Sequence, residues 1–258
     1  MTHPWIAVED ASVALEIGTG HDVKVAVLDS GIESGHPLFS GLVLADDIAI
    51  LDDGLQLKVA DGEGRDVYGH GTAVCDIIRR LAPDAEIGSF RVLGENLRSR
   101  TAIIREGARR ALDSGYQILN CSFGCGREDQ VLQYKDWIDE AYVRGRHIVA
   151  ACNNFDFKKR EWPGHFPTVM TVNLARTKHP EALFYRPGHL VEFAARGQDV
   201  EVAWLGGSIK KVTGSSFAVP HVTALLARLL SVFPNLPPLQ AKALLHQLAS
   251  PWTEDNFG

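Results

Sequence analysis

The sequence predicts an α/β fold in which a mostly parallel central sheet is flanked by helices in three layers. Short apolar runs rich in β-branched residues alternate with segments of helical length along the 258 residues. This alternation is typical of a parallel sheet covered on both faces. No internal repeat, low-complexity linker or shift in composition divides the chain. We therefore expect a single domain over residues 1–258.

The elements follow from local patterns. Residues 23–28 are an apolar run that ends at the turn Asp29-Ser30-Gly31, as a buried strand does. Residues 101–114 carry apolar side chains at helical spacing, with Thr101 as the expected N-cap. By the same criteria, strands are expected at 23–28, 85–93, 117–122, 147–152 and 168–174, and helices at 69–80, 101–114, 131–144, 216–233 and 238–249.

Polar residues that can carry out chemistry lie where these elements begin or end. Asp29 and Asn153 each follow a predicted strand, and His70 and Ser216 each lie at a predicted helix start. Parallel sheets carry their sites at the carboxyl ends of the strands. We therefore expect all four residues to converge on one edge of the sheet.

These residue types suit nucleophilic catalysis. A serine hydroxyl needs an adjacent base, imidazole titrates near neutral pH, and a buried carboxylate orients the imidazole. Each signal has a plainer interpretation, because Ser215 and Ser216 could simply cap a helix and Asp-Ser-Gly is a common turn. Their occurrence together favours catalysis.

Four segments carry these residues in the order Asp, His, Asn, Ser. They are VAVLDSGI with Asp29, YGHGTAV with His70, IVAACNN with Asn153 and TGSSFAVPH with Ser216. Asp before His before Ser is the order of subtilisin, and it differs from that of chymotrypsin and the α/β-hydrolases. From about residue 4 to about residue 249, the chain resembles the subtilisin-like serine proteases, or subtilases.

The resemblance implies a catalytic triad of Asp29, His70 and Ser216. It selects Ser216 over Ser215, since the family's nucleophile lies two residues after the glycine of its Gly-Thr-Ser-Met-Ala motif. The chain departs from the family here, because Ser215 replaces the threonine and Phe217 replaces the methionine.

The resemblance also implies that Asn153 donates to the oxyanion of the acyl-transfer intermediate, together with the backbone N–H of Ser216. The family has Ala-Ala-Gly-Asn where this chain has Ala-Ala-Cys-Asn, so Cys152 replaces a glycine. Asn154 is the alternative donor if the register is shifted by one residue.

The expected substrate-binding residues come from three segments. Ser122-Phe123-Gly124 resembles the family's Ser-Leu-Gly strand, which pairs with an extended substrate and lines the primary specificity pocket. Ala151 is expected to contact substrate as well. Trp162-Pro163-Gly164 resembles the family's Tyr-Pro-Gly turn, which places Glu161 at the base of the pocket.

A carboxylate in that position would favour Lys or Arg before the cleaved bond. The basic loop at 155–160 could instead neutralise Glu161. The sequence leaves both possibilities open.

Bulk properties limit the partners and the location. The net charge of −6 argues against a nucleic-acid partner or an anionic membrane surface. The first residues lack the pattern of a secretory signal, and we expect no stretch apolar enough to span a bilayer. We expect a cytoplasmic protein whose four cysteines remain reduced.

No cofactor or metal is expected. Cys121 and Cys125 lack the second pair that a zinc site needs. The calcium-binding loop that many subtilases carry after the histidine helix has no counterpart. The likeness to the mature catalytic core begins almost at residue 1, as in a compact intracellular-type enzyme without a pro-domain. Such an enzyme would be selective, with a regulatory protein or a cognate precursor as partner.

The favoured function is therefore a serine endopeptidase that hydrolyses peptide bonds of peptide or protein substrates through an acyl-enzyme, acting as a selective processing protease. The alternative is a catalytically silent peptide-binding module that has kept the fold. An esterase or transpeptidase would share the acyl-enzyme step. The complete set of Asp29, His70, Asn153 and Ser216 favours the peptidase.

Overall fold

The computed structural model describes residues 5–54, 56–156 and 158–253, and it contains a mixed sheet whose centre is parallel. The strand order is β12-β8-β9-β7-β6-β5-β1-β4-β2-β3, in which β2 with β3 and β8 with β9 are the antiparallel pairs. The central strands are β7 (Met170–Ala175), β6 (His147–Ala151), β5 (Ile118–Cys121), β1 (Lys24–Asp29) and β4 (Glu86–Arg91). These strands are almost wholly buried, which confirms the predicted α/β class with a mostly parallel sheet.

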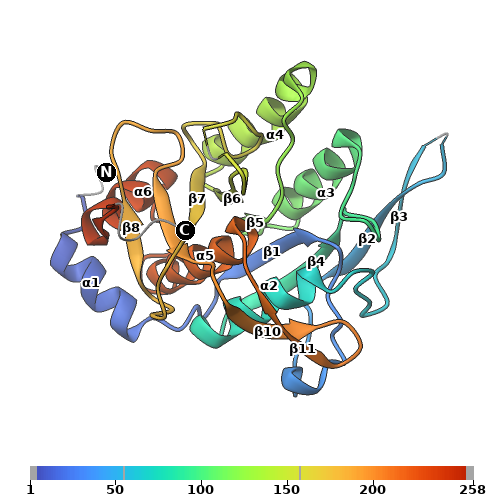
Figure 1. The fold of residues 1–258 in the computed structure, drawn as a ribbon, viewed down its shortest axis with the longest axis horizontal. Coiled ribbons are helices and arrows are strands. Elements are labelled where there is room, and N and C mark those ends of the chain that lie inside the picture. Colours follow the sequence, from blue (N-terminus) through green and yellow to red (C-terminus); the bar gives the residue numbers. More distant parts are fainter. Residues whose placement is uncertain (1–4, 55, 157, 254–258) are drawn as a thin grey trace.

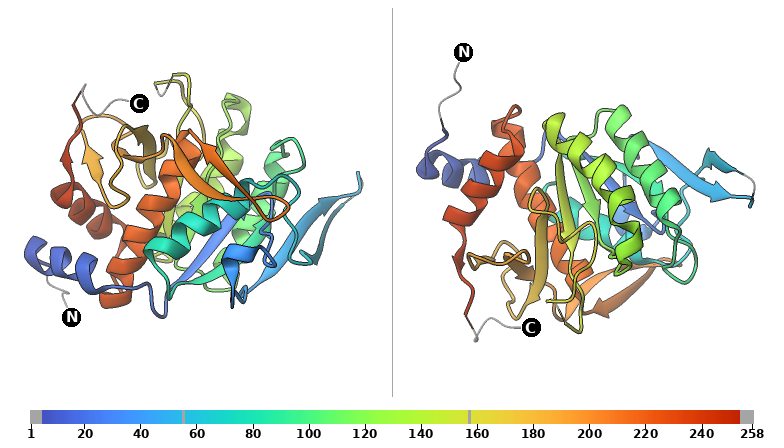
Figure 2. Two further views of the ribbon diagram at one scale, coloured as in Figure 1. Left: turned by 60° about the horizontal axis from the view of Figure 1, so that its bottom comes forward. Right: turned by 90° about the horizontal axis from the view of Figure 1, so that it is seen from above.

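Helices cover both faces of the sheet (Figures 1 and 2). Helices α2 (His70–Leu81) and α5 (Ser215–Val232) pack against each other and against central strands on one face. On that side α1 (Val8–Ile17) and α6 (Pro238–Leu248) pack against α5. The opposite face is covered by α3 (Thr101–Asp113) and α4 (Val131–Val143), which contact each other. Two apolar cores result, one on each face of the sheet.

The predicted central strands and their helices are present, with ends shifted by no more than two residues. Thr101 is not the N-cap that the sequence suggested. It is the first residue of α3, and the cap position is occupied by Arg100, whose side chain makes no capping hydrogen bond. A short polar residue before an apolar helix is a weak indicator of the exact start, because frayed first turns tolerate several caps.

The elements that the sequence pattern missed lie mainly at the periphery. They are α1, the ribbon of β2 (Asp47–Asp52) and β3 (Leu57–Asp61), the ribbon of β10 (Val200–Trp204) and β11 (Ser208–Val212), and the edge strands β8 (Leu183–Tyr185), β9 (Phe193–Arg196) and β12 (Ser250–Pro251). The β2–β3 ribbon projects from the body of the molecule (Figures 1 and 2). Such half-exposed strands lack the continuous apolar runs that identified the central ones.

One expectation about apolar stretches was wrong. Helix α5 has 18 residues and a mean hydropathy of 1.3, which by length and composition would allow it to cross a membrane. It is instead the central helix of the larger core, with 83% of those residues buried in the fold. Its apolar character reflects burial on nearly all sides, as expected for such a helix.

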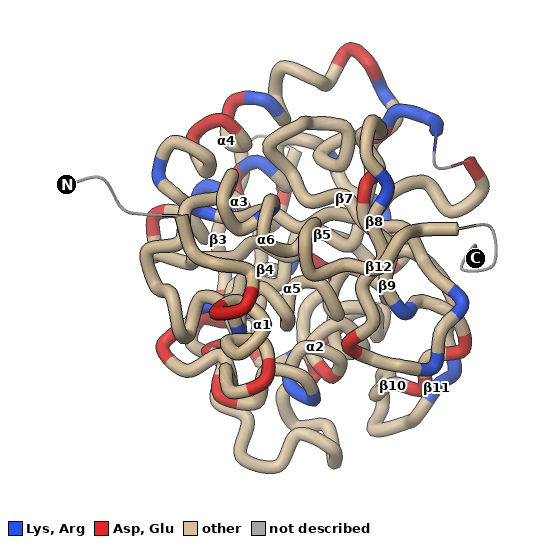
Figure 3. Tube along the Cα trace, turned by 90° about the vertical axis from the view of Figure 1, so that its left-hand side faces the viewer, with Lys and Arg blue, Asp and Glu red and all other residues tan. Residues whose placement is uncertain are grey.

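Charged residues of both signs are interspersed on the side of the molecule shown in Figure 3. This distribution agrees with the modest net charge of −6.

Candidate active site

Three neighbouring parallel strands bring the first site residues to one edge of the sheet. Leu28 of β1 pairs with Cys121 of β5, and Cys121 pairs with Ala150 of β6. The residues that follow in each strand therefore emerge side by side at the carboxyl ends. They include Asp29, Ser122 and Ala151, with Asn153 two residues further on.

Asp29 and His70 form a buried pair. The Nδ1 atom of His70 lies 2.8 Å from Oδ1 and 2.9 Å from Oδ2 of Asp29, and both side chains are almost inaccessible to solvent. The backbone N–H of Ser30 also donates to Oδ1, at 2.8 Å. This arrangement places the Nδ1 proton of His70 against the carboxylate and leaves Nε2 as the basic atom.

Two glycines allow His70 to approach Asp29. Gly69 has φ 107°, in the left-handed region that favours glycine. A Cβ on Gly71 would lie 2.1 Å from the carbonyl oxygen of Gly31 and 3.1 Å from Cβ of Asp29. The Gly-His-Gly sequence is therefore a packing requirement, since helix α2 starts in contact with the end of β1.

A carboxylate that the sequence analysis overlooked holds the start of α2. Asp66 accepts hydrogen bonds from the backbone N–H groups of Tyr68, Gly69 and Thr72 at 2.8–2.9 Å, and from the Thr72 hydroxyl at 2.7 Å. It is 6% exposed. A negative charge at a helix N-terminus is favourable, and an aspartate four residues before the histidine was the available signal.

The pKa of His70 is raised above its usual 6.5. Burial is the largest influence and lowers the pKa, but the charge of Asp29, the hydrogen bond to Asp29 and the charge of Asp66 together outweigh it. The imidazolium form is therefore stabilised, as a base that must hold a proton during catalysis requires.

The two serines at the start of α5 have different environments. Ser215 is fully buried, and its hydroxyl donates to the carbonyl of Cys152 at 2.7 Å while its N–H donates to Oδ1 of Asn154 at 2.7 Å. Ser216 is partly exposed. Ser215 therefore has a structural role, and Ser216 is the accessible hydroxyl.

In the described part of the chain, the Ser216 hydroxyl is not hydrogen-bonded to His70. The ring of the adjacent Phe217 lies 5.1 Å from the imidazole, whereas the Ser216 hydroxyl donates to the carbonyl of Ser122 at 3.0 Å. A rotation about the one side-chain torsion of Ser216 would release that bond. Catalytic hydrogen bonds are often unformed in enzymes without substrate.

Ser122 is held by a chain of buried hydrogen bonds. Its hydroxyl donates to the carbonyl of Ser216 at 2.9 Å and accepts from Nδ2 of Asn120 at 3.0 Å. Oδ1 of Asn120 accepts from the Thr223 hydroxyl of α5 at 2.8 Å. The end of β5 is thus joined to both the first turn and the middle of α5.

The two asparagines after β6 are also distinguished. Oδ1 of Asn154 accepts from the N–H of Ser215, as described above. Oδ1 of Asn153 accepts from the backbone N–H groups of Phe155 and Asp156, both at 2.9 Å, and its Nδ2 donates to Oε1 of Glu161 at 2.7 Å. Asn153 is therefore the asparagine whose amide nitrogen faces Glu161.

The predicted pocket residues are brought together around Glu161. A Cβ on Gly124 would lie 2.6 Å from Oε2 of Glu161, so the absence of a side chain leaves room for the carboxylate. The next residue, Cys125, pairs with Trp162 through two backbone hydrogen bonds of 2.8 and 2.9 Å. The carbonyl oxygen of Ala151 lies against Gly164, since a Cβ on that glycine would lie 2.8 Å from it. Phe123 is half-buried against the core under α3 and α4.

The basic loop forms no ion pair with Glu161 within 4.0 Å among the described residues, which exclude residue 157. Oε1 is held by Asn153, and the ion pairs within 4.0 Å do not include Glu161. The adjacent Cys152 is 4% exposed, and burial, followed by the charge of Glu161, raises the pKa of its thiol to about 12. All four cysteines are free thiols.

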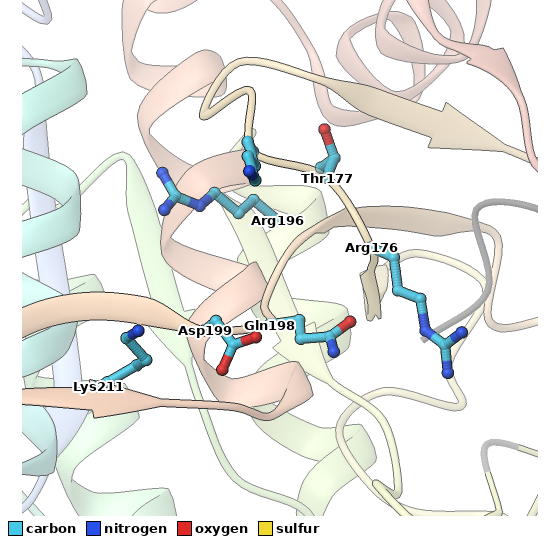
Figure 4. Close-up of a pocket in the computed structure, with 7 residues that line it drawn as sticks. Arg176, Thr177, Arg196, Gln198, Asp199 and Lys211 are labelled. Atoms are coloured by element: carbon cyan, nitrogen blue, oxygen red, sulfur yellow. The ribbon is translucent and has the colours of Figure 1, made fainter.

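A cavity of about 570 Å³ lies apart from the residues described above. It is bounded by residues after β7, at the end of β9, in the loop before β10 and on β11: Arg176, Thr177, Lys178, Arg196, Gln198, Asp199 and Lys211 (Figure 4). Asp29, His70 and Ser216 do not line it, so cavity size does not locate the candidate site. Within residues 5–54, 56–156 and 158–253, no group of three or more His, Cys, Asp or Glu side chains is arranged to hold a metal ion.

Comparison with known families agrees with this geometry. A model of the subtilase family of peptidases matches residues 20–257. The chain belongs to the subtilase family.

Among related subtilases, the chain is 29% identical to subtilisin BL of Lederbergia lenta over 96% of its own length and 91% of that protein. It is also 29% identical to M-protease of Shouchella clausii, of which it spans 64%, and to the minor extracellular protease Epr of Bacillus subtilis, of which it spans 32%. A cold-adapted subtilisin-like serine proteinase is a structural neighbour, with a TM-score of 0.73, 25% identity, and coverage of 90% of this chain and 83% of that one.

Two further side chains on α2 and α5 have defined contacts. Phe217, the residue after Ser216, packs its ring against His70. Asp76 of α2 accepts from the N–H of Ala203 at 2.8 Å and from Arg80 at 2.7 Å. The buried carboxylate therefore ties α2 to the β10–β11 ribbon.

Proposed function

We propose that this subtilase is a serine endopeptidase that cleaves peptide bonds through an acyl-enzyme. Ser216 Oγ attacks the scissile carbonyl and transfers its proton to Nε2 of His70, whose positive charge Asp29 stabilises. The oxyanion accepts hydrogen bonds from the Asn153 side chain and from the N–H of Ser216. When the intermediate collapses, the peptide bond breaks and the His70 proton passes to the leaving amine.

Water then repeats the sequence on the ester. It gives a proton to His70, attacks the acyl carbon, and the ester bond to Ser216 breaks as the proton returns to Oγ. The second residue of a helix has an N–H with no acceptor inside the helix, which suits the N–H of Ser216 to its role. The observation that carries the proposal is the buried Asp29–His70 pair, against which Phe217, the residue after the partly exposed Ser216, packs its ring.

The test is covalent labelling with a fluorophosphonate, together with hydrolysis of peptides. Wild type and Ser215→Ala should be labelled, and Ser216→Ala should not. Peptide hydrolysis by Ser216→Ala should fall by roughly 10⁴-fold or more. Labelling without cleavage of any peptide would favour an esterase or transpeptidase. Absence of labelling in a folded wild-type protein would favour the silent peptide-binding module.

We further propose that the pocket selects Lys or Arg before the cleaved bond. The support is the carboxylate of Glu161, which is half-buried and lacks a cationic partner among the described residues. A desolvated charge pair gives strong discrimination. A panel of otherwise identical peptides with Lys, Arg, Leu or Phe at this position tests the assignment, and a preference for Leu or Phe would contradict it.

A cytoplasmic location and a selective processing role remain proposals of the same kind. They are supported by the four free cysteines and by a specificity pocket that would accept few side chains. Fractionation of cells and a search for cleaved proteins in a strain that lacks the enzyme would test both.

A further inference from the structure

We propose that Glu161 engages the amide of Asn153 in the free enzyme and that a cationic substrate side chain releases it. The proposal rests on the proposed peptidase function. It assigns Glu161 a second role, because the occupant of the specificity pocket would then control the group that stabilises the transition state. Glu161 would affect the rate of chemistry as well as the affinity for substrate.

The orientation of the Asn153 amide is determined by its neighbours. Two backbone N–H groups, those of Phe155 and Asp156, donate to Oδ1 at 2.9 Å. An amide rotated by 180° would set its NH₂ group against these two donors, which is unfavourable. Nδ2 must therefore point away from the loop, and it donates to Oε1 of Glu161 at 2.7 Å.

This contact opposes catalysis for two reasons. One of the two N–H bonds of the amide is already used by a carboxylate. In addition, an oxyanion bound to the same nitrogen would develop negative charge beside that carboxylate, in a partly buried site where like charges repel strongly. An effective oxyanion donor has to be free and oriented before charge develops.

Glu161 is positioned so that a substrate can change this state. Its Oε2 is directed at Gly124, beside the segment expected to bind substrate, and the backbone next to it is fixed by the Cys125–Trp162 hydrogen bonds. The carboxylate lacks an ion-pair partner within the described ranges. An ammonium or guanidinium group that enters the pocket would neutralise it and draw it away from Asn153.

The proposal predicts that Glu161 changes kcat and not only KM, and steady-state kinetics measure the two separately. A residue that only binds the substrate side chain changes KM, whereas a residue that frees a transition-state donor changes kcat. For wild type, kcat with a Lys peptide should exceed kcat with the matched Leu peptide by about a hundredfold, the effect of gaining one oxyanion donor. In Glu161→Ala, kcat for the Leu peptide should rise and the gap in kcat should nearly close.

A direct test uses a small cation in place of the substrate side chain. With a peptide that has Gly before the cleaved bond, n-butylammonium or ethylguanidinium should raise the kcat of wild type and leave Glu161→Ala unchanged. Glu161→Gln is the matched control, because it keeps the size of the side chain and loses the charge that would attract the cation. Thermal unfolding of each variant establishes that it is folded.

The proposal is overturned if both cations act only as competitive inhibitors of wild type, or if kcat for the Leu peptide does not rise in Glu161→Ala. These outcomes are distinct from a failure of the peptidase assignment. If the peptidase assignment itself were wrong, the wild-type protein would neither react with a fluorophosphonate at Ser216 nor cleave the Lys peptide.

Discussion

Replacing Asp66 by asparagine should weaken both the fold and the base. The Asp66 carboxylate accepts four hydrogen bonds at the start of α2, two at each oxygen. An asparagine keeps one oxygen and turns an NH₂ group toward the other two donors, which are then left without an acceptor. Each buried unpaired donor costs about 1–3 kcal/mol, so the loss of two acceptors in Asp66→Asn should lower the free energy of unfolding by about 2–6 kcal/mol.

The same substitution should move the pH dependence of activity. The charge of Asp66 helps to raise the pKa of His70, and His70 must be neutral to accept the serine proton. In wild type, kcat/KM should therefore rise with pH through an apparent pKa above 6.5. In Asp66→Asn this limb should move to lower pH.

The free energy of unfolding should also depend on pH, in the direction set by the raised pKa of His70. Because the folded pKa of His70 is raised, its protonated form contributes stability that is complete below pH 6.5 and is lost as the pH rises through the folded pKa. The cost of Asp66→Asn should therefore be larger in mildly acidic than in alkaline solution.

Urea unfolding at two pH values and a pH profile of kcat/KM provide the measurements. Asp61→Asn is the control, since Asp61 is exposed and accepts a single local hydrogen bond from Glu63, and it should change stability by less than about 0.5 kcal/mol. The reasoning fails if Asp66→Asn changes the free energy of unfolding as little as Asp61→Asn does and if kcat/KM rises with pH at the same apparent pKa as in wild type.

Three further predictions concern the framework of the site. Gly71→Ala should destabilise by about 3 kcal/mol or more and abolish activity, because its Cβ would lie 2.1 Å from the carbonyl oxygen of Gly31; a variant with wild-type unfolding and activity would contradict this. Asp76→Ala should lower stability by about 1–3 kcal/mol because it leaves the buried N–H of Ala203 without its acceptor, and urea unfolding with an unchanged midpoint would refute it. Burial lowers the pKa of His147 to about 4, so His147 should contribute to loss of stability as the pH falls from 6.5 toward that value. A His147→Gln variant, normalised to its own stability at neutral pH, should show a shallower acid dependence, and an equally steep one would rule this out.

Much of the fold could be predicted because its central elements carry their pattern locally. The run 23–28 and the turn after it identify β1 without any knowledge of its neighbours, and the same holds for β5 and β6. The β2–β3 and β10–β11 ribbons escaped prediction because β3 and β11 are largely exposed, and because the partners that bury part of β2 and β10 are distant in sequence. Val200 and Val202, for example, pack beside α2, more than a hundred residues away.

For the site, the short motifs at the ends and starts of regular elements, together with their resemblance to those of the subtilases, singled out Asp29, His70, Asn153 and Ser216. The hydrogen bonds of these residues could not be predicted from local motifs. Asp66 has four partners only after the loop before α2 has folded back, and the separation of Ser215 from Ser216 depends on which hydroxyl the helix buries.

The amino-acid sequence thus determined the order of strands and helices and the chemistry available at their ends, because both depend on a few consecutive side chains. The tertiary structure decided which polar groups share a hydrogen bond, as Asn153 and Glu161 do. Such contacts have ranges of about 3 Å and depend on orientation, so they are set by the packing of loops rather than by local pattern.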